Sequence, residues 1–126
     1  MKAQPKILIV DDSLFIRKML AEILTKNGFT DLIEAENGKM ALELYRSNNP
    51  NLILLDLIMP EMGGLDVLDA LQKENAKIKV VIITAVGGPV IEKETKNSFS
   101  GVEGYISKPF KEAEIIKTVK EVLAKL

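Results

Sequence analysis

The sequence predicts an α/β fold in which helices cover both faces of a five-stranded parallel sheet. Five short apolar runs rich in β-branched residues recur along the chain, and the segments between them have the 3.6-residue spacing of amphipathic helices. The runs are continuously apolar rather than alternating, which is typical of strands that are covered on both faces. Strict alternation of strand and helix favours parallel crossover connections, so we expect a three-layer sandwich of five βα units.

Each strand and helix has its own boundary signals. Ser13 and Asn37 can each cap a helix, the third helix begins after Gly63-Gly64, the fourth has Pro89 in its first turn, and the fifth starts near Lys111. The predicted strands cover residues 7–10, 32–35, 52–55, 80–83 and 104–106. The helical residues expected to face the core are Ile16, Met19, Leu20, Ile23, Leu24, Met40, Ala41, Leu44, Leu65, Leu68, Leu71, Ile115, Ile116, Val119, Val122 and Leu123.

Composition and charge limit the classes of function. The 126 residues fit one domain, and 47% hydrophobic with 28% charged residues is close to the globular average. The chain has no Cys and no His, so any reactive site must use carboxylates, hydroxyls and amines. The 17 Lys and Arg residues against 18 Asp and Glu provide no basic field for nucleic acid. Apolar runs are far shorter than the roughly 20 residues of a membrane span, and we expect a cytoplasmic protein without membrane insertion.

Chemically active side chains follow four of the five predicted strands. The carboxyl ends of parallel strands meet at one edge of the sheet, where ligands bind. Carboxylates about 4 Å apart repel by about 4 kcal/mol at an effective dielectric near 20, so a converging set needs a cation. Carboxylates without His or Cys, in a site open to phosphate, suit Mg²⁺ better than Ca²⁺. The residues at the strand ends are Asp11-Asp12, Asp56, Thr84-Ala85 and Lys108.

The remaining groups at this edge favour phosphate chemistry over metal storage. The ammonium of Lys108, the hydroxyl of Thr84 and the backbone N–H of Ala85 can bind phosphoryl oxygens. One carboxylate can then attack phosphorus and form an aspartyl phosphate, and Asp56 is the best candidate because it ends a central strand. Each residue taken alone also has a structural interpretation, such as helix capping for an Asp pair, and only the set favours function.

These motifs resemble the receiver domain of two-component response regulators, and within it the stand-alone CheY-like chemotaxis type. The matching segments are residues 7–13, 54–64, 84–85 and 105–110, in order over almost the whole chain. The resemblance implies a doubly wound, flavodoxin-like sheet of strand order 2-1-3-4-5 with five helices. It also implies a single receiver domain over residues 1–126, without an output domain, that acts as a monomer.

The resemblance assigns roles at the site. Asp56 would accept a phosphoryl group from a histidine kinase, and Lys108 would pair with the phosphoryl oxygens. The Lys108–Pro109 peptide bond is expected to be cis, as is common at tight turns. Such a domain is a phosphoacceptor rather than an enzyme, with self-catalysed phosphotransfer and autodephosphorylation only. The protein ligands of Mg²⁺ would be Asp11, largely through water, Asp12, Asp56 and the backbone carbonyl of Ile58.

The resemblance also implies a conformational switch. Thr84 would move toward the phosphoryl group, and Tyr105 would turn inward to fill the vacated space, although a strand aromatic is usually plain packing. The surface formed by the fourth helix, fifth strand and fifth helix would then change shape and bind a flagellar motor switch or adaptor protein. The hypothesised partner surface comprises Val90, Lys93, Glu94, Tyr105 and Lys111.

Two positions bear on the lifetime of the phosphoryl group. Ile58 and Val86 occupy the positions that influence hydrolysis of the phosphoryl group in the family, and neither side chain can orient a water, so we expect a moderately long-lived phosphoryl state.

Two alternative functions are also considered. One alternative is a phosphorelay shuttle that passes the group to a histidine phosphotransfer protein. The other is a haloacid-dehalogenase-like phosphatase, but its Asp-x-Asp motif does not match Asp11-Asp12-Ser13.

Overall fold

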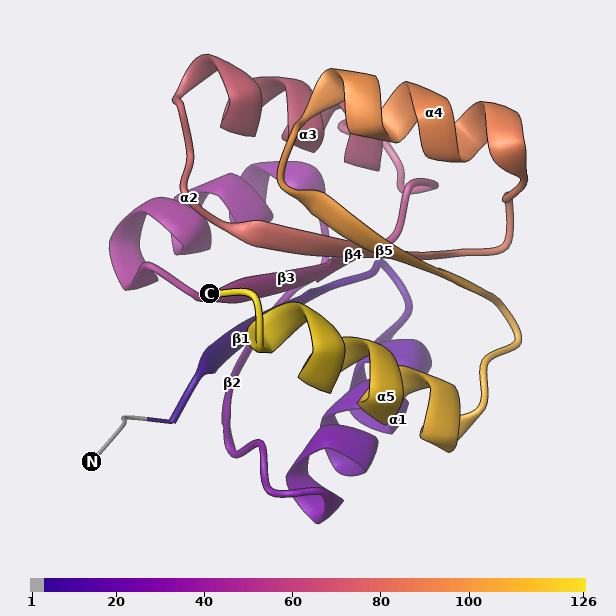
Figure 1. The fold of residues 1–126 in the computed structure, drawn as a ribbon. Coiled ribbons are helices and arrows are strands. Elements are labelled where there is room, and N and C mark those ends of the chain that lie inside the picture. Colours follow the sequence, from indigo (N-terminus) through magenta and orange to yellow (C-terminus); the bar gives the residue numbers. More distant parts are fainter. Residues whose placement is uncertain (1–3) are drawn as a thin grey trace.

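The computed structural model describes residues 4–126, in which five strands and five helices alternate (Figure 1). No helix in this described part is long and apolar enough to cross a bilayer. The strands are β1 (Lys6–Val10), β2 (Asp31–Ala35), β3 (Leu52–Leu55), β4 (Lys79–Thr84) and β5 (Val102–Ser107). The helices are α1 (Leu14–Lys26), α2 (Gly38–Asn48), α3 (Gly64–Lys73), α4 (Pro89–Ser98) and α5 (Glu112–Leu123).

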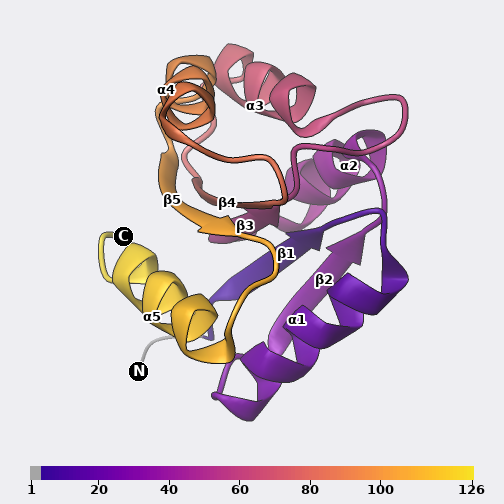
Figure 2. The ribbon, with the colours of Figure 1, turned by 90° about the vertical axis from the view of Figure 1, so that its right-hand side faces the viewer.

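The sheet is parallel throughout and has the strand order β2-β1-β3-β4-β5, which confirms the predicted topology. In the register, Ile9 of β1 lies between Glu34 of β2 and Leu54 of β3. Helices α1 and α5 cover one face of the sheet and α2, α3 and α4 cover the other (Figures 1 and 2). The strand order reverses at β1 and β3, and open α/β sheets bind ligands outside the carboxyl ends of strands at such a point.

Alternate residues of the central strands enter two hydrophobic cores, one on each face of the sheet. In β3, Leu52 and Leu54 pack in the core beneath α1 and α5, whereas Ile53 and Leu55 pack in the core beneath α2 and α3. All four are at most 1% exposed. Burial of one such side chain stabilises the fold by about 1.5–3 kcal/mol, so this strand is a rigid support for the residue that follows it.

Helix starts agree with the sequence, and one predicted core residue does not. The Ser13 side chain accepts a hydrogen bond from the backbone of Ile16, and the Asn37 side chain caps α2 in the same way. Met40 was predicted to face the core, and this is wrong because its side chain is 39% exposed. The buried face of α2 is centred between Ala41 and Leu42, and Met40 lies about 150° around the helix from that midpoint. Residues predicted in the core but only half-buried are Ile16, Met19, Ile23, Leu44, Leu65 and Leu123.

A glycine brings α3 against the loop that follows β3. A Cβ atom at Gly64 would lie 2.6 Å from the carbonyl oxygen of Asp56 and 2.7 Å from the Cα of Leu57. Real Cβ atoms do not approach backbone this closely, so only glycine fits. Gly64 therefore packs the start of α3 directly against Asp56, the residue that follows β3.

Candidate functional site

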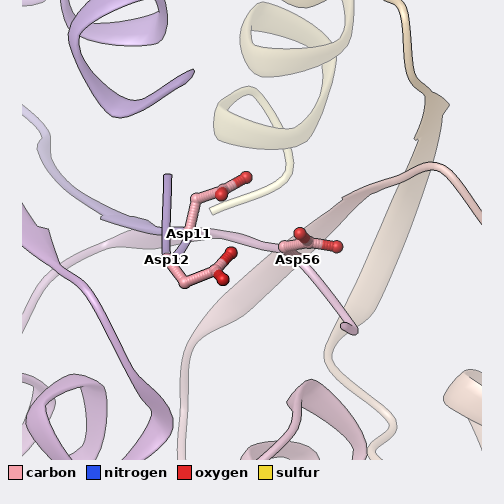
Figure 3. A group of neighbouring side chains, drawn as sticks. All are labelled: Asp11, Asp12 and Asp56. Carbon is pink, nitrogen blue, oxygen red and sulfur yellow. The ribbon is translucent and has the colours of Figure 1, made fainter. Parts of the chain in front are cut away.

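Three carboxylates meet at the carboxyl edge of the sheet. Asp11 and Asp12 follow β1 and Asp56 follows β3, and Figure 3 shows the three side chains as one group. One oxygen from each lies within 4.8 Å of the others. The Asp11 and Asp56 residues are buried, at 2% and 6% exposed, whereas Asp12 is exposed to solvent. The prediction that the strand order brings these residues together agrees with this geometry.

Lys108 supplies the positive charge nearest to the buried pair. Its Nζ donates hydrogen bonds to Asp11 Oδ2 at 2.7 Å and to Asp56 Oδ2 at 3.0 Å. Burial disfavours the charged ammonium, but the hydrogen bonds and charges of the two carboxylates outweigh burial and raise the pKa of Lys108 above its ordinary value. Lys108 therefore stays charged, and three carboxylates facing one ammonium leave the group about two charges negative.

The backbone holds the second oxygen of each buried carboxylate. Asp11 Oδ1 accepts from the N–H of Ser13 at 2.9 Å, and Asp56 Oδ1 accepts from the N–H of Ile58 at 3.2 Å. Both carboxylates are thus fixed between a backbone donor on one side and Lys108 on the other. This arrangement pre-orients Asp56 Oδ2 beside a cation, which is the environment that a phosphoryl acceptor requires.

The donor set fits a hard divalent cation. All three side chains offer carboxylate oxygens, the excess negative charge needs a counter-charge, and the described part of the chain offers no softer ligand because the sequence has neither Cys nor His. Ile58, whose backbone carbonyl was predicted as a further ligand, lies in the same loop as Asp56, and its side chain is 61% exposed. These residues could hold Mg²⁺.

The ends of β4 and β5 lie beside this cluster. Thr84 is 3% exposed at the end of β4, and its hydroxyl oxygen accepts a hydrogen bond from the N–H of Val86 at 3.4 Å. The backbone N–H of Lys108 donates to the carbonyl of Thr84 at 2.9 Å, which joins the two loops. Ala85 is exposed, and the Lys108–Pro109 peptide bond is cis.

Tyr105 and Thr84 border one pocket. The pocket lies between the β4–α4 loop and β5, and its wall includes both residues and Ile91. Tyr105 is half-buried, and its hydroxyl donates to the carbonyl of Glu92 at 2.7 Å and accepts from Thr95 at 3.0 Å. Thr84 and Tyr105, the two residues predicted to switch together, therefore line the same pocket.

The predicted partner surface lies at the exterior on α4 and at the start of α5. Val90 is 76% exposed, and Lys93, Glu94 and Lys111 are also exposed. Tyr105 reaches this surface only in part, because it is half-buried on β5. The five residues thus offer one apolar side chain among charged ones.

Arg17, which lies near the site, was not among the residues predicted from the sequence. Arg17 on α1 is only 9% exposed, and its guanidinium donates to the carbonyl of Asp11 at 2.8 Å and to Glu34 Oε1 at 3.1 Å. It therefore braces the backbone that carries the acidic pair. The signal was present in the sequence, because a cation stands between Ile16 and Leu20 on the face expected to be apolar.

The fold and the site together define a receiver-type signalling domain. The chain matches the family model described as the response regulator receiver domain over residues 7–120, and it belongs to this family. Receivers of this family are phosphoacceptor switches rather than classical enzymes.

Individual relatives agree with this assignment. "Chemotaxis protein CheY" of Bacillus subtilis (strain 168) is 35% identical over 118 residues, which cover 94% of this chain and 97% of that protein. "Sporulation initiation phosphotransferase F" of the same organism is 37% identical over 118 residues, covering 94% and 93%. The solved receiver domain of the Francisella response regulator 1452 superimposes with a TM-score of 0.87 at 32% identity, covering 96% and 98%.

Proposed function

We propose that this domain is a phosphorylation-activated signalling switch in which Asp56 accepts a phosphoryl group from a histidine kinase. The observation that supports this most strongly is Asp56 Oδ2, buried at the sheet edge 3.0 Å from Lys108 Nζ and within a cluster of three carboxylates. An oxygen of Asp56 forms a bond to phosphorus as the bond from phosphorus to the kinase histidine nitrogen breaks, and the nitrogen keeps the electron pair.

The neighbouring residues stabilise the transferred group. Lys108 pairs with the phosphoryl oxygens, and the Thr84 hydroxyl and the Ala85 N–H donate to them. Asp12, Asp56 and the carbonyl of Ile58 would hold Mg²⁺ directly, and Asp11 would act largely through water. When bound, the ion neutralises charge on the carboxylates and on the phosphoryl oxygens.

Phosphorylation changes the surface through Thr84 and Tyr105. A phosphoryl group adds about −1.5 to −2 charges at pH 7, and a hydroxyl donor that turns toward it is favoured. As Thr84 leaves its present position, the pocket that it shares with Tyr105 opens to the tyrosine ring. The phosphoryl group shifts this equilibrium only as far as it interacts better with one state, so Thr84 carries the coupling. Tyr105 then reshapes the α4-β5-α5 surface with Val90, Lys93, Glu94 and Lys111.

The pathway that we propose is chemotaxis. Several relatives that cover nearly all of the chain carry the name chemotaxis protein CheY. We infer a receiver switch that acts as a monomer in the cytoplasm, with a chemotaxis-type kinase upstream and a flagellar motor switch or adaptor protein downstream. The relay shuttle has the same site chemistry, and one relative is named a phosphotransferase.

The test follows a labelled phosphoryl group from a chemotaxis-type kinase to this protein and then measures binding to a flagellar switch protein. We expect transfer to the wild type, none to Asp56→Asn, and tighter binding of the phosphorylated form. Thr84→Ala should still accept the label but lose the gain in affinity, and an equal gain in that variant contradicts the switch. Rapid onward transfer to a histidine phosphotransfer protein, without target binding, supports the relay instead.

A further inference from the structure

Thr95 is a buried polar residue of α4 that the site chemistry does not use. It is 0% exposed, and its hydroxyl lies 3.0 Å from the hydroxyl of Tyr105 and 3.0 Å from the carbonyl of Glu92. Tyr105 in turn donates to the same carbonyl at 2.7 Å. Two hydroxyls and one carbonyl thus form a closed triangle between α4 and β5.

The donors and acceptors of this triangle determine what happens when Tyr105 moves. Thr95 has a single hydroxyl proton, which it can give either to Tyr105 or to the carbonyl of Glu92. If Tyr105 leaves, the Thr95 proton still has an acceptor within hydrogen-bond distance, and no buried donor is stranded. The Tyr105 hydroxyl can therefore leave Thr95 and the Glu92 carbonyl with a net loss of one hydrogen bond.

The rest of α4 shows how the Thr95–Tyr105 contact is placed along the helix. At the carboxyl end of the helix, Lys96 Nζ donates to the carbonyls of Ser100 and Val102, both at 2.8 Å, and pairs with Glu103, so this end is fastened to β5. At the amino end the helix follows Gly88, which has a φ of 109°. The Thr95–Tyr105 contact lies between these ends and, together with the hydrogen bond from Tyr105 to the Glu92 carbonyl, joins the helix to the tyrosine.

We propose that Thr95 is a positioning residue that holds the hydroxyl of Tyr105 against α4 and so limits how often the ring reorients. The Thr95–Tyr105 hydrogen bond, which we call the tether, is present in the unphosphorylated protein. Its consequence for signalling rests on the proposed function, in which Tyr105 moves when Thr84 turns to the phosphoryl group. Loss of the tether then makes reorientation easier before any phosphoryl group is present.

The sequence permits a clean measurement, because the chain has two Tyr and no Trp. In a Tyr45→Phe background, Tyr105 is the only tyrosine, and selective ¹³C labelling gives one set of ring signals by NMR. One hydrogen bond corresponds to a roughly 2- to 12-fold change in an equilibrium constant. We expect Thr95→Val to raise the ratio of the second Tyr105 ring position to the first by that factor, without phosphate or Mg²⁺, and Thr95→Ser to restore the original ratio.

Two results overturn this proposal. An unchanged Tyr105 spectrum in Thr95→Val means that the hydroxyl does not hold the ring, and a Thr95→Ser variant that behaves like Thr95→Val means that packing alone is responsible. Thr118→Val is the matched control, because it makes the same exchange on α5 beside Gly104 of the same strand and should leave Tyr105 unaffected.

A second measurement does not depend on NMR. The urea-unfolding constants of Thr95→Val, Tyr105→Phe and the double variant form a cycle that isolates the contact. We expect a coupling of roughly 2- to 12-fold in the unfolding constant, and additive effects of the two substitutions overturn the tether.

The signalling consequence has its own readout. Without acetyl phosphate, Thr95→Val should bind the flagellar switch protein more tightly than the wild type. With acetyl phosphate and Mg²⁺, its gain in affinity on phosphorylation should be smaller than that of the wild type. If Asp56 takes no phosphoryl group, the proposed function fails while the tether measured in the resting protein stands. Equal resting affinity of the two proteins refutes the coupling of Thr95 to the output.

Discussion

Replacing Asp12 with asparagine is expected to stabilise the metal-free protein. The carboxylate oxygens of Asp12, Asp11 and Asp56 lie within 4.8 Å of one another. Two unit charges at that distance repel by about 0.9 kcal/mol in the dielectric of water and about 3.5 kcal/mol at an effective dielectric near 20. Asp12 is exposed, so the lower value applies to each of its two neighbours. Loss of the favourable interaction of Asp12 with the start of α1, about 0.3–1 kcal/mol, and loss of its attraction to the Lys108 ammonium offset much of the gain. We expect the free energy of unfolding to rise by less than about 1 kcal/mol.

With Mg²⁺ bound, the wild type should be more stable than Asp12→Asn. An ion at ten times its dissociation constant stabilises the folded wild type by about 1.4 kcal/mol, and Asp12→Asn lacks one of the ligands and gains less. Urea unfolding with EDTA and with Mg²⁺ measures both quantities. The matched control is Asp69→Asn, an exposed charge on α3 whose loss should change stability by less than about 0.5 kcal/mol in either condition. A variant that is less stable than the wild type without metal, or equal stabilisation of both by Mg²⁺, refutes this reasoning.

Three further predictions concern stability and lifetime. Burial raises the pKa of Glu34, but hydrogen bonds from Lys18 and Arg17 outweigh it and lower this pKa below its ordinary value. The stabilisation by Glu34 is therefore complete above the unfolded-state pKa and is lost as pH falls through the folded-state pKa. Glu34→Gln should be less stable than the wild type at pH 7, and the difference in urea midpoint should shrink as pH falls through the lowered folded-state pKa. Leu54→Ala removes a side chain that is 1% exposed in a central strand, and it should cost about 2–5 kcal/mol in urea unfolding; a loss below about 1 kcal/mol contradicts the packing described. Ile58 and Val86, 61% and 41% exposed, present no polar group to a hydrolytic water, so the aspartyl phosphate should persist well beyond a few seconds when its decay is followed by mass spectrometry.

The main features of the site could be predicted because strand ends in a parallel sheet share an edge. Once the apolar runs of β1, β3 and β4 were recognised, the residue after each had to lie at that edge. Asp11, Asp56 and Thr84 were found in this way. Their order across the sheet came from the family resemblance, because strand order depends on crossover connections that the pattern of apolar residues does not specify.

Features that depend on packing between elements were harder to predict. The fifth strand was predicted to start at Gly104 but begins two residues earlier, at Val102. The charged Glu103 interrupts the apolar run and hides this start in the sequence. A Cβ at Gly104 would lie 2.9 Å from the Cγ2 of Thr118 on α5, so a larger residue there would require the Thr118 side chain to shift. The pairing of Thr95 with Tyr105 is a similar case, since it depends on how α4 lies against β5, and no local pattern in the sequence indicates it.

Intact-mass analysis after incubation with acetyl phosphate tests the central claim most directly. We expect the wild type to gain one phosphoryl group with Mg²⁺ and little without it, and Asp56→Asn to gain none under either condition. Asp69→Asn should behave as the wild type. No gain in the wild type with Mg²⁺, or an equal gain in Asp56→Asn, would contradict the assignment of Asp56 as the phosphoacceptor.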